Sequence, residues 1–198
     1  MVIHTFGDSH SFKGWTNIPN VLTHHLGPKL CFSIGRDGIN IKDGYNVNNG
    51  DTVIFCFGEI DCRCHIHKHI TKGNNYKQII DNIVNNYFIE IKKAVNTFKN
   101  LNTFIYNVVP PIQRHNTPEN LAYPYLGTDD ERKEYVLYFN EKLKQKCIEY
   151  NFLFFDVYNN YIDSYGFLNK SLSDGNVHIR NGVYLKEFIK NNLSNKIE

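Results

Sequence analysis

Ser9 lies near the start of the chain, between Asp8 and His10, and a serine hydroxyl can act as a nucleophile. Ser9 follows an apolar run at residues 2–6 that predicts a β-strand, and Gly7 allows a tight turn from that strand into a helix. Such a turn lifts a hydroxyl clear of a sheet and surrounds it with backbone N–H groups that stabilise negative charge. Ser, Asp and Gly also form ordinary helix N-caps, so this segment alone leaves both interpretations open.

A serine hydroxyl needs a base within hydrogen-bond reach, and the base needs a partner that fixes its tautomer. Asp174 and His178 can fill these roles, in a polar segment at residues 173–179 before the last predicted helix. A solvated turn is the alternative, because Asp-Gly and Asn are common in turns. We therefore predict Ser9 as nucleophile, His178 as base and Asp174 as the acid that orients the base.

Apolar runs of strand length alternate with helix-length segments along the chain, which indicates right-handed crossovers and an α/β/α sandwich of three layers. The runs lack strict alternation, as expected for parallel strands covered on both faces. We expect one domain over residues 1–198, with functional groups at the carboxyl ends of the strands. The predicted strands are 2–6, 30–34, 52–57, 103–109 and 152–157, and the predicted helices are 76–98, 129–150 and 183–193.

The segment at residues 110–127 is long for a connection between a strand and a helix, so it is a candidate flap over Ser9. Three aromatic residues lie outside the apolar stripes: Trp15, Tyr123 and Tyr125. They are candidate walls of a substrate cleft, because aromatic faces stack on the C–H faces of sugars. Burial against the sheet is nevertheless the default explanation for most of them.

The order of these segments resembles the SGNH hydrolases, also called the GDSL family, over nearly the whole chain. Residues 7–9, Gly-Asp-Ser, resemble the nucleophile block, Gly35 the glycine of the second block, and residues 58–61, Gly-Glu-Ile-Asp, the third block. Asp174 and His178 resemble the terminal acid and base, although three residues separate them where the family commonly has two. The resemblance implies a flavodoxin-like, mostly parallel five-stranded sheet and ester hydrolysis through an acyl-serine intermediate, with no cofactor.

The resemblance also implies an oxyanion hole formed by the backbone N–H groups of Ser9 and Gly35. The family usually has an asparagine in the third block that donates to the oxyanion, and Ile60 occupies that position here. Loss of one such donor typically costs about 10²–10³ in rate. Arg63 is the predicted substitute, with an ion pair to Glu59 or Asp61 as its alternative.

Four polar residues adjoin these blocks and are predicted to bind substrate: Asp8, His10, Glu59 and Asp61. For His10, a solvent-facing position at the start of the helix is the alternative. The segment at residues 62–69 carries Cys62, Cys64, His65, His67 and His69, which are of zinc-binding types. No second pair with zinc spacing accompanies them, so we predict no metal site.

The formal net charge of +2 gives no basic excess for binding a nucleic-acid backbone, so we expect no nucleic-acid partner. No apolar run approaches the roughly 20 residues that cross a bilayer, and no signal peptide is visible, so no membrane partner is expected. Five cysteines without a regular framework fit a reducing compartment, and we expect a cytoplasmic protein. Oligomeric state stays open.

The leading hypothesis is an esterase that removes a short acyl group, such as acetyl, from a carbohydrate or other small ester. An acetyltransferase is the first alternative; it would use acetyl-CoA and deliver the acetyl group to a sugar hydroxyl or amine. A catalytically silent member that binds glycans or a protein is the second, and Ile60 is the residue that keeps it open. The presence of Ser9, His178 and Asp174 together argues against the silent alternative.

Overall fold

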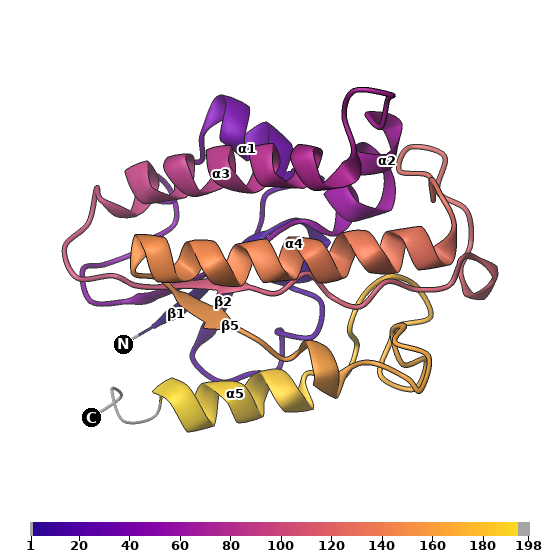
Figure 1. The fold of residues 1–198 in the computed structure, drawn as a ribbon. Helices are drawn as coiled ribbons and strands as arrows, with labels where there is room; N and C mark the ends of the chain where they lie inside the picture. The colour runs from indigo at the N-terminus through magenta and orange to yellow at the C-terminus, as the bar shows by residue number, and fades with distance from the viewer. Residues whose placement is uncertain (1, 194–198) are drawn as a thin grey trace.

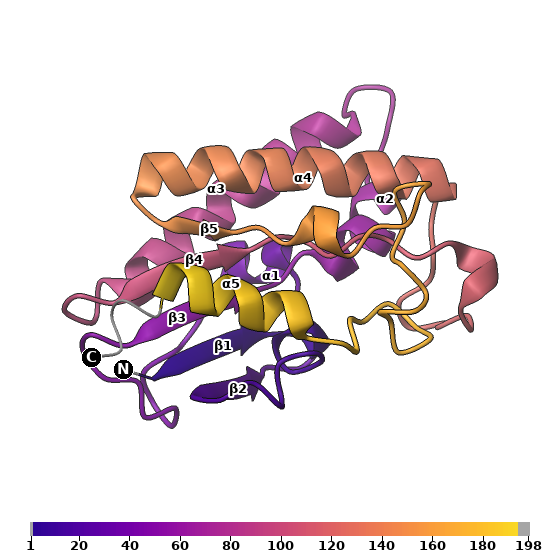
Figure 2. The same cartoon turned by 90° about the horizontal axis from the view of Figure 1, so that it is seen from below.

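One parallel sheet runs through the computed structural model, which describes residues 2–193, and helices cover both of its faces (Figures 1 and 2). The strand order is β2-β1-β3-β4-β5, and every neighbouring pair is parallel. This arrangement confirms the predicted α/β/α sandwich. The strands are β1 (Ile3–Gly7), β2 (Val21–His25), β3 (Thr52–Cys56), β4 (Asn102–Tyr106) and β5 (Leu153–Phe155).

Three helices pack on one face of the sheet, and one helix covers the other face (Figure 2). The first group is α1 (Cys31–Asp37), α3 (Tyr76–Val95) and α4 (Asp129–Tyr150), and the helix on the opposite face is α5 (Val183–Leu193). Short turns follow several strands. They are η1 (Ser9–Ser11), the π-helical η2 (Asp61–His65), α2 (Ile66–Lys68), η3 (Arg114–Asn116) and η4 (Tyr158–Asn160).

The register of the central strands brings their carboxyl ends together. Gly7 at the end of β1 aligns with His25 of β2 and with Cys56 of β3. A Cβ atom at position 7 would collide with the carbonyl oxygen of Cys56, so the close approach requires glycine. The segments that follow β1, β2 and β3 therefore leave the sheet at one edge, as expected for a functional rim in an open α/β sheet.

The second predicted strand is wrong, and this error also misplaces one predicted site residue, Gly35. Residues 30–34 begin helix α1 instead, and β2 lies earlier in the chain. The Asp61 carboxylate accepts hydrogen bonds from the N–H groups of Cys31 and Phe32, at 2.7 and 3.1 Å, and so holds the start of α1. β2 has polar side chains because it is an edge strand, where the His24 ring stacks on Phe6 with centroids 4.5 Å apart.

The long helices agree closely with their predicted ranges. Thr128 and Glu131 form a capping box at the start of α4, and Asn151 ends that helix in the left-handed conformation. Helix α5 begins at residue 183, where predicted, whereas α3 ends three residues before its predicted end. Local sequence signals determine these helices, so they could be located without tertiary information.

Trp15 is buried against the sheet, which was the default expectation, and does not form a wall of a substrate cleft. Its side chain is completely buried between the sheet and α5, in edge-to-face contact with Tyr106 and Phe155 at centroid distances of 5.5 and 5.3 Å. Its indole N–H donates to the carbonyl oxygen of His10 at 2.9 Å. Trp15 therefore anchors the turn that follows β1 onto the hydrophobic core.

Candidate active site

The turn after β1 presents Ser9 at the sheet edge. Asp8 caps η1, because its Oδ1 atom accepts the backbone N–H of His10 at 2.9 Å. The Ser11 hydroxyl lies 2.9 and 3.0 Å from the carbonyl oxygens of Asp8 and of His24 in β2, and its single proton can be donated to either of them. These bonds fix the backbone on both sides of Ser9, while its own side chain stays partly exposed.

A continuous hydrogen-bond chain links Ser9 to the two predicted partners. The Ser9 Oγ atom lies 2.8 Å from His178 Nε2, and His178 Nδ1 lies 2.9 Å from Asp174 Oδ2. Residues 173 and 179 form an isolated bridge, and the Asp174 N–H donates to the His178 carbonyl oxygen at 3.1 Å. This closed loop accommodates three residues between the acid and the base. The arrangement has the geometry of a nucleophile, a base and an orienting acid.

The protonation states suit those roles. Burial, then the nearby charge of His10, lowers the pKa of His178 to about 4, against the opposing effect of Asp174. Burial tends to raise the pKa of Asp174, but His178 and backbone N–H groups outweigh it and lower the pKa below its usual value. Lys13 lies 3.8 Å from Asp174 and adds positive charge on the exposed side. At neutral pH the imidazole of His178 is therefore unprotonated and able to accept a proton.

A cavity of about 270 Å³ opens beside the Ser9 hydroxyl. Its lining combines residues from the ends of β1, β2 and β3 with residues of the segments 110–127 and 173–179. They are Asp8, Ser9, His25, Pro28, Ile60, Arg63, Asn120, Tyr123, Asn176, Val177 and His178. Sequence reasoning missed His25, Pro28, Asn120 and Asn176, because only the fold brings these polar or small residues to the nucleophile.

Gly35 does not reach this cavity, so its predicted place in the oxyanion hole is wrong. It lies inside α1, where an added Cβ would approach Asn86 Cβ of α3 to 2.9 Å, and it lines a separate cavity. The glycine that follows β2 is Gly27, with φ +77°, next to the cavity-lining Pro28. Within residues 2–193, neither the Gly27 nor the Ser9 N–H hydrogen-bonds to another protein group.

Arg63 lies in η2 and lines the cavity, as predicted for the substitute donor. Its Nη2 atom is 3.1 Å from Glu59 Oε2, so the ion pair with Glu59 that was the alternative prediction is also present. Its guanidinium lies over the rings of Tyr123 and Tyr125, 5.9 and 5.4 Å from their centroids. The Arg63 Nε–H has no hydrogen-bond acceptor among the described residues, although the side chain is 92% buried. Ile60 beside it presents only hydrocarbon to the cavity.

The four residues predicted to bind substrate are instead held by protein groups. Asp61 is completely buried at the start of α1, and burial raises its pKa to about 7. Glu59 is buried against Arg63, and burial raises its pKa as well. Asp8 lines the cavity but is 1% exposed, and it binds the ring of His10, which is 6% exposed. His10, Glu59 and Asp61 do not line the cavity beside Ser9, which corrects the prediction for these three, whereas Asp8 does line it and its predicted contact with substrate stays a prediction.

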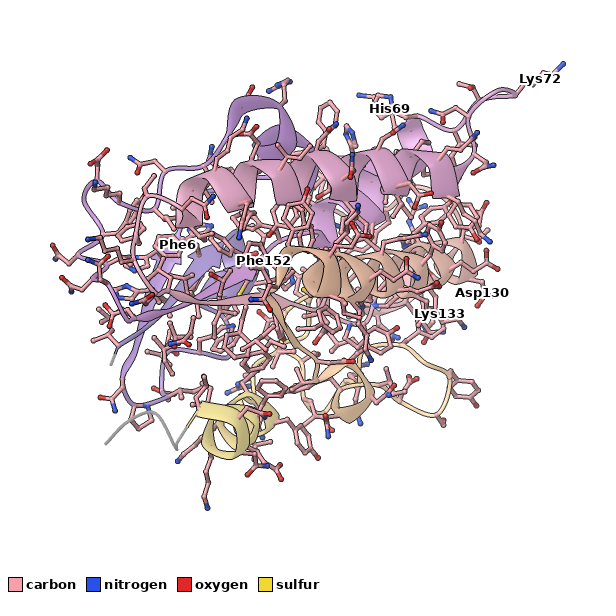
Figure 3. All side chains as sticks on the ribbon, turned by 60° about the vertical axis from the view of Figure 1, so that its left-hand side comes forward. Phe6, His69, Lys72, Asp130, Lys133 and Phe152 are labelled. Atoms are coloured by element: carbon pink, nitrogen blue, oxygen red, sulfur yellow. The ribbon has the colours of Figure 1, made fainter. Side chains whose placement is uncertain are left out.

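Two histidines of residues 62–69, His65 and His69, pack on each other with ring centroids 4.5 Å apart, and the other side chains of this segment contact separate partners. The Cys64 thiol donates to the Ile60 carbonyl at 3.3 Å, His67 hydrogen-bonds the Tyr135 hydroxyl at 3.0 Å, and His65 packs on Phe32. His69 lies at the surface near the loop that carries Lys72 (Figure 3). Within residues 2–193, no group of three or more histidine, cysteine, aspartate or glutamate side chains is placed to hold a metal ion.

The segment 110–127 extends to the same end of the molecule as the loop that carries the acid and the base (Figure 2). The Thr117 hydroxyl donates to Asn176 Oδ1 at 3.0 Å, and Tyr125 packs with Ile112 and Val177. Tyr123 lines the cavity as predicted, whereas Tyr125 is buried beneath it. The segment therefore forms one wall of the cavity and contacts the loop that carries Asp174 and His178.

Comparison with solved structures places this architecture among the SGNH hydrolases. A GDSL-like lipase from Bacteroides thetaiotaomicron matches with a TM-score of 0.58 at 12% identity, over 96% of this chain and 85% of its own. The aryl esterase of M. smegmatis matches with 0.54 at 14% identity, over 96% and 98%. A protein assigned to the G-D-S-L family from Desulfitobacterium hafniense matches with 0.56 at 15% identity, over 94% of each chain.

The chain therefore has the fold of the SGNH hydrolases, and its sequence has diverged far from these structures. No protein-family model and no curated protein sequence matches it. Among the described helices, none is both long and apolar enough to span a membrane.

Proposed function

We propose that this protein hydrolyses small carboxylic esters through an acyl intermediate on Ser9. The observation that carries the proposal is the hydrogen-bond chain from Asp174 through His178 to the Ser9 hydroxyl, at the mouth of an open cavity. A binding module has no need for an unprotonated imidazole aimed at a serine. The shared fold with lipases and esterases supports the same reaction class but does not identify a substrate.

The reaction divides into two steps. His178 Nε2 accepts the hydroxyl proton as Ser9 Oγ bonds to the ester carbonyl carbon, and the same proton passes to the leaving alcohol as the ester bond breaks. Water then attacks the acyl-serine, gives its proton to His178, and releases the acid as the proton returns to Ser9. Asp174 holds the His178 ring and stabilises the imidazolium that forms in each step.

The negative charge on the carbonyl oxygen requires hydrogen-bond donors. We assign this role to the backbone N–H groups of Ser9 and Gly27, and to the Nε–H of Arg63 in place of the asparagine usual in the family. Two of these groups are backbone amides at the strand ends. The third is the buried guanidinium that lines the cavity.

The cavity favours a short acyl group on a polar alcohol. Its volume of about 270 Å³ is at the lower end for small-molecule sites, which leaves little room for a fatty chain. Asn120 and Asn176 offer amides to hydroxyl groups, and Tyr123 offers an aromatic face. We therefore propose acetyl esters of carbohydrates or of similar small alcohols as substrates, in a reaction that needs no cofactor.

A fluorophosphonate probe tests the nucleophile directly. We expect peptide mass spectrometry to locate one adduct on Ser9 in the wild type, and none in Ser9→Ala or His178→Ala. The matched control is Ser171→Ala, because Ser171 is an exposed serine outside the cavity. Labelling that persists in folded Ser9→Ala would contradict the assignment.

A substrate panel then separates the remaining alternatives. Hydrolysis of p-nitrophenyl acetate and of acetylated oligosaccharides, with at least a tenfold loss from acetyl to octanoyl, is the expected outcome. Consumption of acetyl-CoA that depends on an added sugar or amine would identify an acetyltransferase instead. Glycan binding by a protein that neither reacts with the probe nor turns over an ester would identify a silent binding member.

A further inference from the structure

A second pair of histidine and carboxylate lies directly behind the triad. His10 Nδ1 is 2.8 Å from Asp8 Oδ1, and the ring centroids of His10 and His178 are 5.0 Å apart. Both members of the pair are almost fully buried. This pair takes no part in the proposed proton transfers, because His10 and Asp8 hydrogen-bond to each other and to backbone groups, and not to the side chains of Ser9, His178 or Asp174.

The neighbours of His10 determine its protonation state. Its Nε2 atom lies 3.2 Å from the carbonyl oxygen of Val177, which can only accept a hydrogen bond, so Nε2 carries a proton. Its Nδ1 atom faces Asp8 Oδ1, which already accepts the backbone N–H of His10 and so acts as an acceptor. Two acceptors on opposite sides of one imidazole require two N–H groups. The geometry of these two contacts therefore favours an imidazolium over a neutral ring.

Surrounding charges agree with this assignment. Burial alone would lower the pKa of His10, but Asp8, then Glu59 on the segment after β3, and the Val177 carbonyl raise it to about 9. Arg63 is the nearest cation on that segment, and it is paired with Glu59. His178 also faces His10, from the loop that carries Asp174, with the ring centroids 5.0 Å apart.

The position of His10 has two consequences for His178. Val177 is the residue before His178, so the His10–Val177 hydrogen bond ties the catalytic loop to the turn that carries Ser9. A buried cation 5.0 Å away also opposes a second positive charge on His178. Lys13 also lowers the pKa of His178, whereas Asp174 raises it.

We propose that His10 is a positioning residue: a permanent imidazolium, held by Asp8, that docks the His178 loop onto the nucleophile turn and keeps the base unprotonated under mildly acidic conditions. The proposal rests on the proposed function for its kinetic consequence only. The protonation state of His10 and the docking of the loop are properties of the protein at rest.

The first experiment uses the wild-type protein and no substrate. Long-range ¹H–¹⁵N NMR of ¹⁵N-histidine-labelled protein, assigned with His10→Gln, should show two protonated nitrogens on His10 from pH 5 to pH 8. His178 should remain a neutral ring with one protonated nitrogen until the pH falls below about 5. A neutral His10 ring at pH 7 would overturn the proposal, whatever the activity of the protein.

The second experiment compares His10→Gln with His69→Gln, which changes a surface histidine outside the site. Glutamine can still donate one hydrogen bond but carries no charge. In His10→Gln the apparent pKa of the acidic limb of kcat/KM for p-nitrophenyl acetate should rise by at least about one pH unit, because the cation that opposes protonation of His178 is lost. KM should change little. In His69→Gln the apparent pKa of the acidic limb should equal that of the wild type.

A loss of thermal stability in His10→Gln with an unmoved acidic limb would mean a structural role only, and would overturn the proposal. If His10→Gln does not fold, Asp8→Asn provides the second variant, because it removes the negative charge that holds the imidazolium. If no ester is turned over, the pH dependence of fluorophosphonate labelling at Ser9 replaces kcat/KM. Absence of labelling in the wild type at every pH refutes the proposed function, whereas the NMR result alone decides the state of His10.

Discussion

Asp174 has the most exposed position of the three triad side chains, and it touches only His178 among them. In the proposed reaction its contribution is therefore to orient the imidazole and to stabilise its charged form, not to move a proton. Two other carboxylates near the site have a similar role, because each is buried and holds a cation that we propose to act on the site. Asp8 holds His10, and Glu59 holds Arg63.

For Asp174→Asn we expect kcat to fall by about 10²–10⁴ while KM changes little, because the amide allows the wrong tautomer of His178. Steady-state kinetics with p-nitrophenyl acetate measures the effect. Asp163→Asn is a matched control, since Asp163 supports a turn outside the cavity. An unchanged kcat in Asp174→Asn would show that another group orients the base.

Arg63 should act on the transition state more than on binding. Its removal leaves Glu59 buried without a cation, so the test compares Glu59→Gln with the double variant Glu59→Gln/Arg63→Met. We expect the double variant to lose about 10²-fold in kcat relative to the single variant, as for one oxyanion donor. A loss that appears only in KM would assign Arg63 to substrate binding instead.

Elements with local signals were predictable from the sequence, and elements defined by pairing were not. Helix α4 carries acidic residues in its first turn and a capping box, which the chain encodes within a few residues. Strand β2 carries two histidines and a threonine, and only its pairing with β1 makes it a strand. The run at residues 30–34 is apolar enough for a strand, but Asp61 fixes it as the start of a helix.

The same distinction applies to the candidate site. The triad could be found from residue types and from a family resemblance, because its chemistry demands those types. Gly27, which we propose as a donor, was missed because its place depends on where β2 ends, and the error in β2 moved the expected donor to Gly35. The burial of His10 and Glu59 depends on packing from three separate segments, which no local pattern records.

Gly35→Ala should destabilise the packing of α1 on α3 without affecting the chemistry. The added Cβ would approach the Asn86 side chain to 2.9 Å and the backbone of Tyr87 to 3.1 Å. We expect a net loss of about 1–2 kcal/mol in the free energy of unfolding, since overpacking exceeds the gain in helix propensity. Calorimetry measures it, with Gly73→Ala, which meets no neighbour, as control. A large fall in kcat of folded Gly35→Ala would return Gly35 to the active site.

At the scale of the whole molecule, the five cysteines behave as small hydrophobic residues. All are free; four are buried, and burial raises the thiol pKa of each above its usual value. Cys64 is half-buried, and burial raises its pKa to about 11. Thiolates are the reactive form, so few are present at pH 8.

We therefore expect almost no reaction of the native protein with Ellman's reagent at pH 8, and reaction of all five thiols in guanidinium. Reducing agents should leave the melting temperature unchanged. Rapid modification of one native thiol would identify a cysteine that local opening exposes. The expected candidate for any such opening is Cys64, in the π-helical turn beside the cavity.

The single tryptophan gives the molecule a spectroscopic reporter at its most informative position. Trp15 is fully buried, and its indole N–H is bonded to the carbonyl oxygen of the residue that follows the nucleophile. Its fluorescence should therefore be blue-shifted in the folded protein and should respond when the turn at Ser9 moves. Acylation of Ser9, docking of the His178 loop and global unfolding thus become separable by emission wavelength and lifetime, without an added label.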